Sequence, residues 1–388
     1  MKITDIKTVV VNAQMRNWVF VKVETDQAGL YGWGEGTLEW KTRAITGCVE
    51  DLKPMLVGRD PTRIEFLWQI MYRHSFWRLG IIGTTAMSAI EQACWDILGK
   101  ELGVPVYRLL GGRVRDRVRM YTHLGMGEMK AVYETVEAGP LIDRAHAVIE
   151  KGYRALKVVI VPYSQPLTGL PAVKHFAAMM EKLREAVGPE IDIMIDFHGR
   201  TTTGQAIEYI RAVEEYHPLF CEEPVPPENP DALLEVRRSV RVPIATGERL
   251  ATRWEFRRVC ELQACHVLQP DLSHCGGLLE ARKIASMGET YLMGVAPHNP
   301  NGPIANAAAL HFDLATPNFL IQEDMLGDVP WRFDVVQADL RSQEGHWLPP
   351  EKPGLGVEVN EAEALKHPFQ QEVMEQLTFH ADGSVAEW

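Results

Sequence analysis

The stretch IDIMIDFHGR, residues 191–200, places an acid and an imidazole directly after a short apolar run. Asp196 and His198 stand two positions apart at the end of that run. A short apolar run that ends in polar residues is typical of a strand buried inside a parallel sheet. The flanking sequence decides whether these two side chains are structural or belong to an active site.

Eight runs of this kind alternate with segments of helical periodicity. They are RVRMYTHLG (117–125), YRALKVVIV (153–161), IDIMIDFH (191–198), LFCEEP (219–224), VPIATGE (242–248), HVLQPDL (266–272), YLMGVAPH (291–298) and NFLIQED (318–324). Such an alternation predicts an α/β fold in which eight parallel strands close into a (β/α)8-type, TIM-like barrel. In barrels of this type the active site lies at the carboxyl ends of the strands.

The residues before the barrel follow a different pattern. Strand-like runs with turn residues between them occupy the first 60 positions, and helical segments follow, including TTAMSAIEQACWDILGKELGVP (84–105). We therefore expect an α+β domain over residues 1–116 and the barrel over residues 117–344. Residues 345–388 are expected to leave the barrel and return to the first domain.

Composition excludes several classes of function. The chain has 388 residues, of which 46% are apolar, and a net charge of -12. This acidic balance without a basic stripe argues against a nucleic-acid partner. No apolar stretch approaches the roughly 18 residues of a membrane span, and the six cysteines are scattered without the density of a disulfide scaffold. We expect a cytoplasmic protein that does not bind membranes.

Ionisable residues recur at the predicted carboxyl ends of successive strands. Lys157 lies on the second strand, and the series continues with Asp196, Glu222, Glu248, Asp271, His298 and Glu323. From Asp196 onward, successive members lie 23–27 residues apart, which is about one βα unit. Charged residues on helix surfaces would not recur at the same position relative to each apolar run. The barrel should therefore bring these side chains to one rim.

Three adjacent acids of the series, Asp196, Glu222 and Glu248, would repel one another unless a cation neutralised them. Oxygen ligands favour a hard ion, so the sequence predicts Mg²⁺ rather than zinc. The alternative is that each carboxylate caps a helix N-terminus. His198 is expected to point into the same cavity as Asp196, because positions i and i+2 of a strand share a face. A lone histidine is more often structural, but here its placement favours catalysis.

Many short motifs together resemble the enolase superfamily, in particular the mandelate racemase subgroup and, within it, the galactonate dehydratases. They include GLYGWGEG, MYRHSFWRLG, DFHGR, EEPV, GERLATR, LQPDLSHCGG, APHNPNGPIA, LIQED, KPGLGVEV and SVAEW, and they span nearly the whole chain. The order and spacing of the set make it specific. The resemblance implies an enolase-like fold in which the α+β domain caps the barrel, and it implies a homo-oligomer.

Roles for the rim residues follow from this resemblance. Asp196, Glu222 and Glu248 would hold the metal. His298, paired with Asp271, would be the base that removes the proton beside the substrate carboxylate. His198 would be the acid that protonates the departing 3-hydroxyl. Glu323, in its protonated form, would donate a hydrogen bond to the developing enolate oxygen.

The implied activity is a carbon–oxygen lyase reaction on a small-molecule sugar acid, which gives a 2-keto-3-deoxy acid. The racemases of the subgroup carry a second base in a Lys-x-Lys pair, and this chain has Val159 where the second lysine would stand. A dehydratase similar to D-galactonate dehydratase is therefore favoured. The alternatives are a dehydratase of gluconate, mannonate or a pentonate, a racemase or epimerase, and a paralogue that binds a metal and an acid sugar without turnover.

Contacts with the substrate are expected from the cap and from Lys157. Family members close cap loops over the barrel mouth, which makes Trp18, Trp77 and Arg78 candidates here. For the two tryptophans, packing between domains is an equal alternative. Lys157 could support the site electrostatically, or its stem could simply cover apolar surface.

Overall fold

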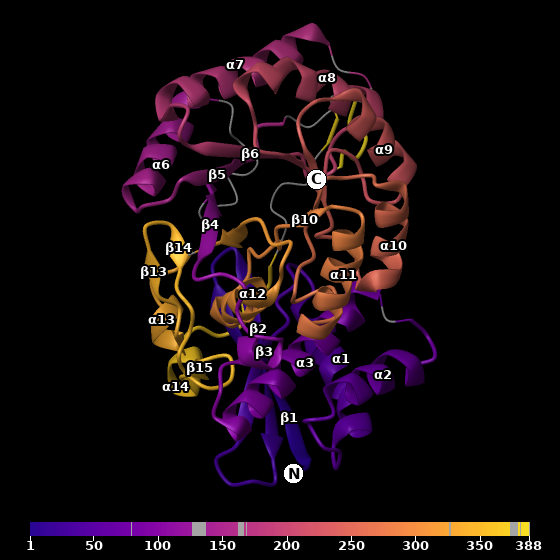
Figure 1. The fold of residues 1–388 in the computed structure, drawn as a ribbon, viewed down its shortest axis with the longest axis vertical. Helices are drawn as coiled ribbons and strands as arrows, with labels where there is room; N and C mark the ends of the chain where they lie inside the picture. Colours follow the sequence, from indigo (N-terminus) through magenta and orange to yellow (C-terminus); the bar gives the residue numbers. More distant parts are fainter. Residues whose placement is uncertain are drawn as a thin grey trace.

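The computed structural model describes residues 1–78, 80–125, 137–161, 167, 169–325, 327–372, 379–380 and 382–387. Figure 1 shows helices arranged around a group of strands, with a smaller body of strands and helices packed below them. The predicted fold, an α/β barrel with an α+β cap, is confirmed. None of the described helices has both the length and the apolar character needed to cross a membrane.

The cap begins with an antiparallel sheet of three strands, packed against a helical layer. The strands are β1 (Ile3–Ala13), β2 (Arg16–Thr25) and β3 (Tyr31–Glu35), and the helices are α1 (Thr42–Leu56), α2 (Ile64–His74), α3 (Gly80–Leu102) and the short α4 (Val106–Leu109). Strand β3 lies so close to α3 that a methyl group on Gly34 would overlap the carbonyl oxygen of Ala89. Glycine at this position therefore permits the sheet and the helix to pack directly.

Eight parallel strands form the barrel in the described part of the chain. They are β4 (Val118–His123), β5 (Ala155–Val158), β6 (Asp192–Asp196), β7 (Cys221–Glu222), β8 (Ile244–Thr246), β9 (Val267–Leu268), β10 (Gly294–Val295) and β11 (Gln322–Asp324). Neighbours pair in chain order from β4 to β10. A bridge between Val295 and Phe319 and the pairing of β11 with β4 close the ring. Each predicted apolar run contains one of these strands.

Helices that follow the strands cover the outside of the barrel. They are α6 (Ala138–Glu150), α7 (Leu170–Val187), α8 (Thr203–Val213) with the 3-10 turn η1 (Glu214–Tyr216), α9 (Pro230–Ser239), α10 (Thr252–Leu262), α11 (Leu278–Thr290) and α12 (Pro303–Ala315). Local sequence sets where they begin. Thr202 and Gln205 form a capping box at α8, and Asn229 accepts two backbone N–H groups at the start of α9.

One side chain from each strand, or from the residue next to it, packs in one layer of the barrel interior below the rim. The layer consists of Tyr121, Ala155, Met194, Phe220, Ala245, Val267, Ala296 and Ile321. Because strand side chains alternate between faces, the residue two positions later points into the barrel again, nearer its rim. For Met194, Phe220 and Ile321, that residue is an acid from the predicted series.

After the barrel, the chain adds short elements beside β4, and its later residues bind to the cap. Its elements are α13 (Arg332–Val335), β12 (Val336–Ala338), β13 (Ser342–Gln343), β14 (His346–Trp347), β15 (Val357–Val359) and α14 (Glu361–Ala364). Strand β14 pairs antiparallel with β4, and β12 pairs with β15. The backbone N–H of Asn12 donates to the carbonyl of His367, and Asn17 Nδ2 donates to that of Gln370. The exact domain boundaries stay a prediction.

Buried carboxylates of the cap accept hydrogen bonds from the first turns of two barrel helices. Glu35 accepts from the backbone N–H groups of Gly302, Ile304 and Ala305 at the start of α12, at 2.6, 3.1 and 2.9 Å. Glu91 does the same at α11, where Leu278 and Leu279 donate. A helix N-terminus presents unpaired donors and a partial positive charge, so these acids fasten the cap to the barrel rim.

Replacement of the Glu35 side chain tests this attachment. Glu35→Ala leaves buried N–H groups of α12 without an acceptor, and we expect it to lower the free energy of unfolding by at least about 1–3 kcal/mol. Urea unfolding followed by tryptophan fluorescence measures the loss. Glu101→Ala, at an exposed position near the end of α3, is the matched control. Equal stability of the two variants would contradict the proposed attachment.

Candidate active site

Three carboxylates from neighbouring strands converge at the barrel rim. Asp196 ends β6, Glu222 ends β7 and Glu248 follows β8, and one oxygen from each lies within 4.8 Å of the others. Asp196 and Glu222 are buried, and Glu248 is largely so. Asp196 Oδ2 and Glu248 Oε2 are buried, and their contacts among the described residues are His198 Nε2 at 3.1 Å from the first and His298 Nε2 at 3.5 Å from the second, besides Lys157. A set of three buried or largely buried carboxylates that supplies only oxygen donors fits a hard divalent cation.

Lys157 lies among these acids and brings a positive charge to the rim. Its ammonium is 3.1 Å from both carboxylate oxygens of Glu222, 3.4 Å from Asp196 Oδ2 and 2.7 Å from Glu323 Oε1. The residue is only 2% exposed. A buried ammonium with three carboxylate partners serves electrostatics, so the alternative of a stem that only covers apolar surface is wrong.

The charges at the rim perturb one another. Burial raises the pKa of Glu222 well above its usual value, and the neighbouring acids add to this effect against the opposing charge of Lys157. Burial also opposes ionisation of Glu323, but the charges of Lys157 and His298, together with the hydrogen bonds from Lys157 and Asn299, hold its pKa below the usual range. The surroundings of Glu323 thus favour its charged form, and the expected protonated form stays a prediction.

His298, at the end of the seventh strand region, is held by Asp271. Its Nδ1 is 2.9 Å from Asp271 Oδ2, and Asn301 Nδ2 donates to the same oxygen at 2.9 Å. Nδ1 therefore carries a proton, and Nε2 faces the cavity 3.5 Å from Glu248 Oε2. Burial lowers the pKa of His298, but the charges of Glu248 and its other acidic neighbours prevail and raise it to about 10.

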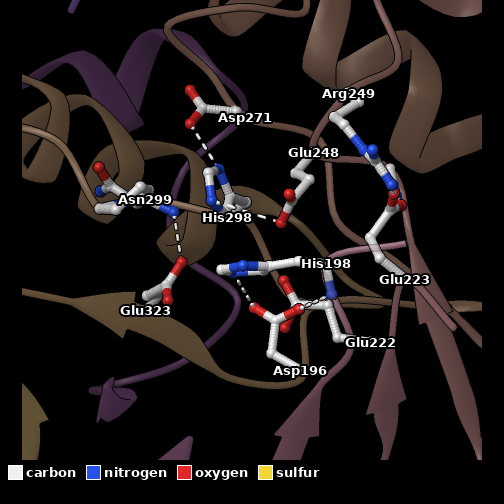
Figure 2. A network of polar contacts seen from close by, with 12 residues as sticks. Asp196, His198, Glu222, Glu223, Glu248, Arg249, Asp271, His298, Asn299 and Glu323 are labelled. Atoms are coloured by element: carbon white, nitrogen blue, oxygen red, sulfur yellow. Dashed lines mark hydrogen bonds and ion pairs between the residues drawn. The ribbon is translucent and has the colours of Figure 1, made fainter. Parts of the chain in front are cut away.

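His198 reaches the same cavity by a route that strand alternation does not describe. Strand β6 ends at Asp196, and His198 has a φ of 50°, in the left-handed region. Its backbone N–H donates to Asp196 Oδ1 at 2.9 Å, and its Nε2 lies 3.1 Å from Asp196 Oδ2. A turn thus folds the ring back over the carboxylate. Figure 2 shows the rings of His198 and His298 between the carboxylates of Asp196 and Asp271.

An ion pair between the partly exposed Arg249 and the buried Glu223 supports the turn that carries His198. Arg249 Nε and Nη2 donate to Glu223 Oε2 at 2.9 and 2.7 Å, as Figure 2 shows. Burial opposes the charge of Arg249, but Glu223, Glu248 and, more weakly, Glu387 raise its pKa. The guanidinium packs against Gly199, where any side chain would meet it and where φ is 68°. Arg249 and Gly199 together fix the position of the His198 turn.

The cap closes the cavity with residues other than the predicted ones. Its lining includes Met15, Arg16, Glu39 and Trp40 from the cap, in addition to the rim residues. Arg16 and Glu39 form an ion pair at 2.7 Å. The side chains therefore come from the turn after β1, from the first residue of β2 and from the loop after β3.

The predicted cap contacts do not line this cavity. Trp18 is fully buried in the hydrophobic core on β2, so packing, the alternative, holds for it. Trp77 is 77% exposed, and Arg78 stacks over the ring of Tyr72, 4.7 Å from its centroid. None of the three lines the cavity, because Trp18 packs into the core and Arg78 is held beside Tyr72 of α2.

Sequence reasoning missed several polar groups of the site. Asn299 donates its backbone N–H to Glu323 Oε2 at 2.9 Å, and His274 Nε2 lies 3.5 Å from Asp271 Oδ2. His123 lines the cavity at the end of β4. A signal for His123 was present, because it follows Tyr121 of the interior layer by two positions, as Asp196 follows Met194.

The cap and the barrel each match a model of a known protein family. Residues 2–111 match the model described as the mandelate racemase / muconate lactonizing enzyme N-terminal domain. Residues 141–363 match the model described as enolase C-terminal domain-like.

Full-length relatives and solved structures extend this match. The chain is 40% identical to a D-galactonate dehydratase of Verminephrobacter eiseniae over all of both chains, and 41% identical to one of Ralstonia nicotianae over 96% of each. An enolase from Pantoea ananatis with bound D-gluconate and Mg superposes with a TM-score of 0.89 at 30% identity, covering 99% of both chains. An enolase superfamily member from Salmonella Typhimurium gives 0.88 at 34% identity, over 95% of this chain and 98% of that one.

The packing of the His198 turn against the Arg249 guanidinium can be tested by a substitution at Gly199. Gly199→Ala places a methyl group against the Arg249 guanidinium at a left-handed φ, so we expect the His198 ring to move from Asp196 and the fold to lose about 1–3 kcal/mol. A crystal structure and urea unfolding of the variant measure both effects. Gly204→Ala is the control, because that glycine lies in α8 with open space around it. An unmoved His198 ring would contradict the prediction.

Proposed function

Because the chain belongs to the enolase superfamily, in the family of mandelate racemase and muconate lactonizing enzymes, we propose that it is a Mg²⁺-dependent sugar-acid dehydratase acting on D-galactonate. The observation that carries the proposal is the pair of histidines in one cavity beside the three-acid cluster. The substrate would lose the C2 proton and the 3-hydroxyl as water, which leaves a 2-keto-3-deoxy acid.

Asp196, Glu222 and Glu248 are the proposed ligands of Mg²⁺. Their oxygen-only donor set, their proximity and the burial of their oxygens support this assignment. A solved neighbour with bound Mg supports it by similarity. When bound, the ion supplies positive charge that stabilises the negative charge developing on the substrate carboxylate as C2 loses its proton.

His298 is the proposed base. Asp271 holds its Nδ1 proton, so Nε2 is the atom that faces the cavity and accepts the proton from C2. The acids around His298, Glu248 foremost, cause its raised pKa. Neutralisation of Glu248 would lower that pKa towards the range in which a histidine accepts a proton at neutral pH.

His198 is the proposed acid. Hydroxide is a poor leaving group, so elimination requires a positioned proton donor, which is typically worth about 10²- to 10⁴-fold in rate. His198 Nε2 lies 3.1 Å from Asp196 Oδ2, which holds the ring at the cavity. Its ring lies in the same cavity as that of His298 (Figure 2), which suits removal of a proton at C2 and delivery of another at the C3 oxygen.

Lys157 and Glu323 complete the proposed machinery with roles that differ from the first expectation. An ionised Glu323 has no proton to donate to an enolate oxygen. Lys157, 2.7 Å from it, has three donors and a positive charge. We assign stabilisation of the substrate carboxylate to Lys157 and the positioning of Lys157 to Glu323.

Racemisation is the main alternative within the family. It requires a base on each face of C2, and Val159, the residue two positions after Lys157, is apolar and buried. The residue across from His298 is His198, which suits an acid for a leaving group. D-galactonate is preferred as substrate because the full-length relatives carry that name. D-gluconate is the second candidate, since a neighbour of similar fold binds it.

The metal proposal predicts a stabilisation that depends on Asp196. At Mg²⁺ concentrations about 100 times the dissociation constant, we expect binding to stabilise the fold by about 2.7 kcal/mol and to raise the melting temperature. Asp196→Asn should abolish most of this rise. Asp116→Asn, at a site where the side chain is 91% exposed, should preserve it. Thermal unfolding with and without Mg²⁺ is the measurement, and equal shifts in both variants would reject the assigned ligand.

The histidine roles predict different defects in D2O. With D-galactonate and Mg²⁺, we expect His298→Asn to abolish deuterium exchange at C2 and formation of 2-keto acid. His198→Asn should lower 2-keto acid formation by about 10²- to 10⁴-fold while C2 exchange persists. Proton NMR and a 2-keto acid assay report the two steps. His175→Asn, on the exposed face of α7, is the control.

Three outcomes of this experiment would overturn parts of the proposal. Full dehydration by the His198 variant would remove the assignment of the acid. C2 exchange without 2-keto acid in the unaltered enzyme would indicate a racemase. Neither exchange nor product with D-galactonate, D-gluconate, D-mannonate or a pentonate would favour a protein that binds without turnover.

A further inference from the structure

A third histidine lies in the cavity and takes no part in the proposed proton transfers. His123 ends β4, and the parallel pairing of β4 with β5 sets it opposite Lys157. It is 8% exposed and lines the same cavity as Lys157, His198 and His298. The barrel pleat explains its direction, because Tyr121, two positions earlier, belongs to the interior layer.

A backbone hydrogen bond fixes the tautomer of the His123 ring. The N–H of Gly125 donates to His123 Nδ1 at 2.8 Å. A backbone N–H can only donate, so Nδ1 must offer its lone pair, and the proton of the neutral ring is then on Nε2. Burial and the nearby charge of Lys157 lower the pKa of His123 to about 3. The ring is thus a neutral donor with one N–H.

The other end of the ring has no partner within the described residues. His123 Nε2 is buried and makes no hydrogen bond there. The other two histidines of the cavity differ, since His298 is held by Asp271 and His198 by Asp196. A buried N–H without an acceptor is unfavourable, and native structures seldom retain one without a functional reason. An oxygen of a bound molecule would satisfy it.

We propose that His123 Nε2 donates a hydrogen bond to an oxygen of the bound sugar acid and so acts as a substrate-binding residue separate from the acid and the base. This inference rests on the proposed function. A neutral donor suits a hydroxyl or carboxylate oxygen, and it adds no charge to a rim that already holds Lys157 and four acids. A substrate with hydrogen in place of that oxygen leaves the donor unpaired and binds less well.

Two substitutions test the roles of Nδ1 and Nε2 of His123 separately. In His123→Asn the side-chain oxygen can replace Nδ1 as acceptor for Gly125, but no donor reaches the position of Nε2. In His123→Gln the longer amide can reach that position with an N–H. Both are made in the His298→Asn background, so that binding is measured without turnover. His175→Asn in the same background is the control for loss of an exposed histidine.

Calorimetric titration of D-galactonate in the presence of Mg²⁺ measures binding. We expect His123→Asn to raise the dissociation constant by about three- to tenfold, the usual weight of a neutral hydrogen bond, and His123→Gln to restore part of the affinity. In ¹⁵N-histidine NMR spectra, the Nε2–H signal of His123 should shift on addition of D-galactonate. A merely structural role would not move that signal with the ligand.

The outcomes distinguish this inference from the proposed function. If D-galactonate binds the His298→Asn protein and His123→Asn binds it equally well, with an unchanged Nε2–H signal, the role of His123 is overturned. If neither D-galactonate nor D-gluconate binds the His298→Asn protein or the unaltered protein, the proposed function fails, and the inference fails with it. Weaker binding by His123→Asn together with a shifted signal supports both.

Discussion

Repulsion among buried acids at the barrel rim is the constraint on which the site depends. Asp196, Glu222 and Glu323 share one ammonium, that of Lys157, and Glu248 lies beside the first two. Each buried charge without a partner costs several kcal/mol, so the group is stable only if the scaffold is rigid and cations are close. A closed ring of paired strands provides that rigidity, since no strand can shift to separate the acids.

The barrel and most of its rim could be predicted from the sequence because both follow from strand alternation. An interior residue such as Phe220 fixes Glu222 two positions later in the same direction, and the repeat of the βα unit aligns the strands. His123 obeys the same rule, because it follows Tyr121 of the interior layer by two positions. His198 could not be placed by this rule, since its left-handed turn depends on Gly199 and on Arg249, a residue 50 positions away.

The cap contacts could not be predicted because they depend on how two domains dock. Trp18 is large and aromatic, yet it faces the hydrophobic core, whereas Arg16, two positions earlier on β2, reaches the cavity. The docking itself is set by buried acids of the cap, Glu35 and Glu91, at the first turns of barrel helices. Their apolar sequence surroundings suggest that both acids are buried, but which backbone groups they bind is visible only in three dimensions.

The barrel contributes the charged groups of the cavity, and the cap contributes much of its shape. Under the proposed function, chemistry at the substrate carboxylate and C2 would depend on rim residues such as Lys157 and His298, which the barrel holds fixed. The opposite side of the cavity is built by cap loops, where Arg16 and Glu39 form an ion pair. Because paired charges attract each other, a polyhydroxylated chain can meet them through hydrogen bonds without bringing a counter-charge of its own. A change in these loops can therefore alter which hydroxyl configurations fit while the rim and its reaction stay the same, which accounts for neighbours of one fold that carry different sugar acids in their names.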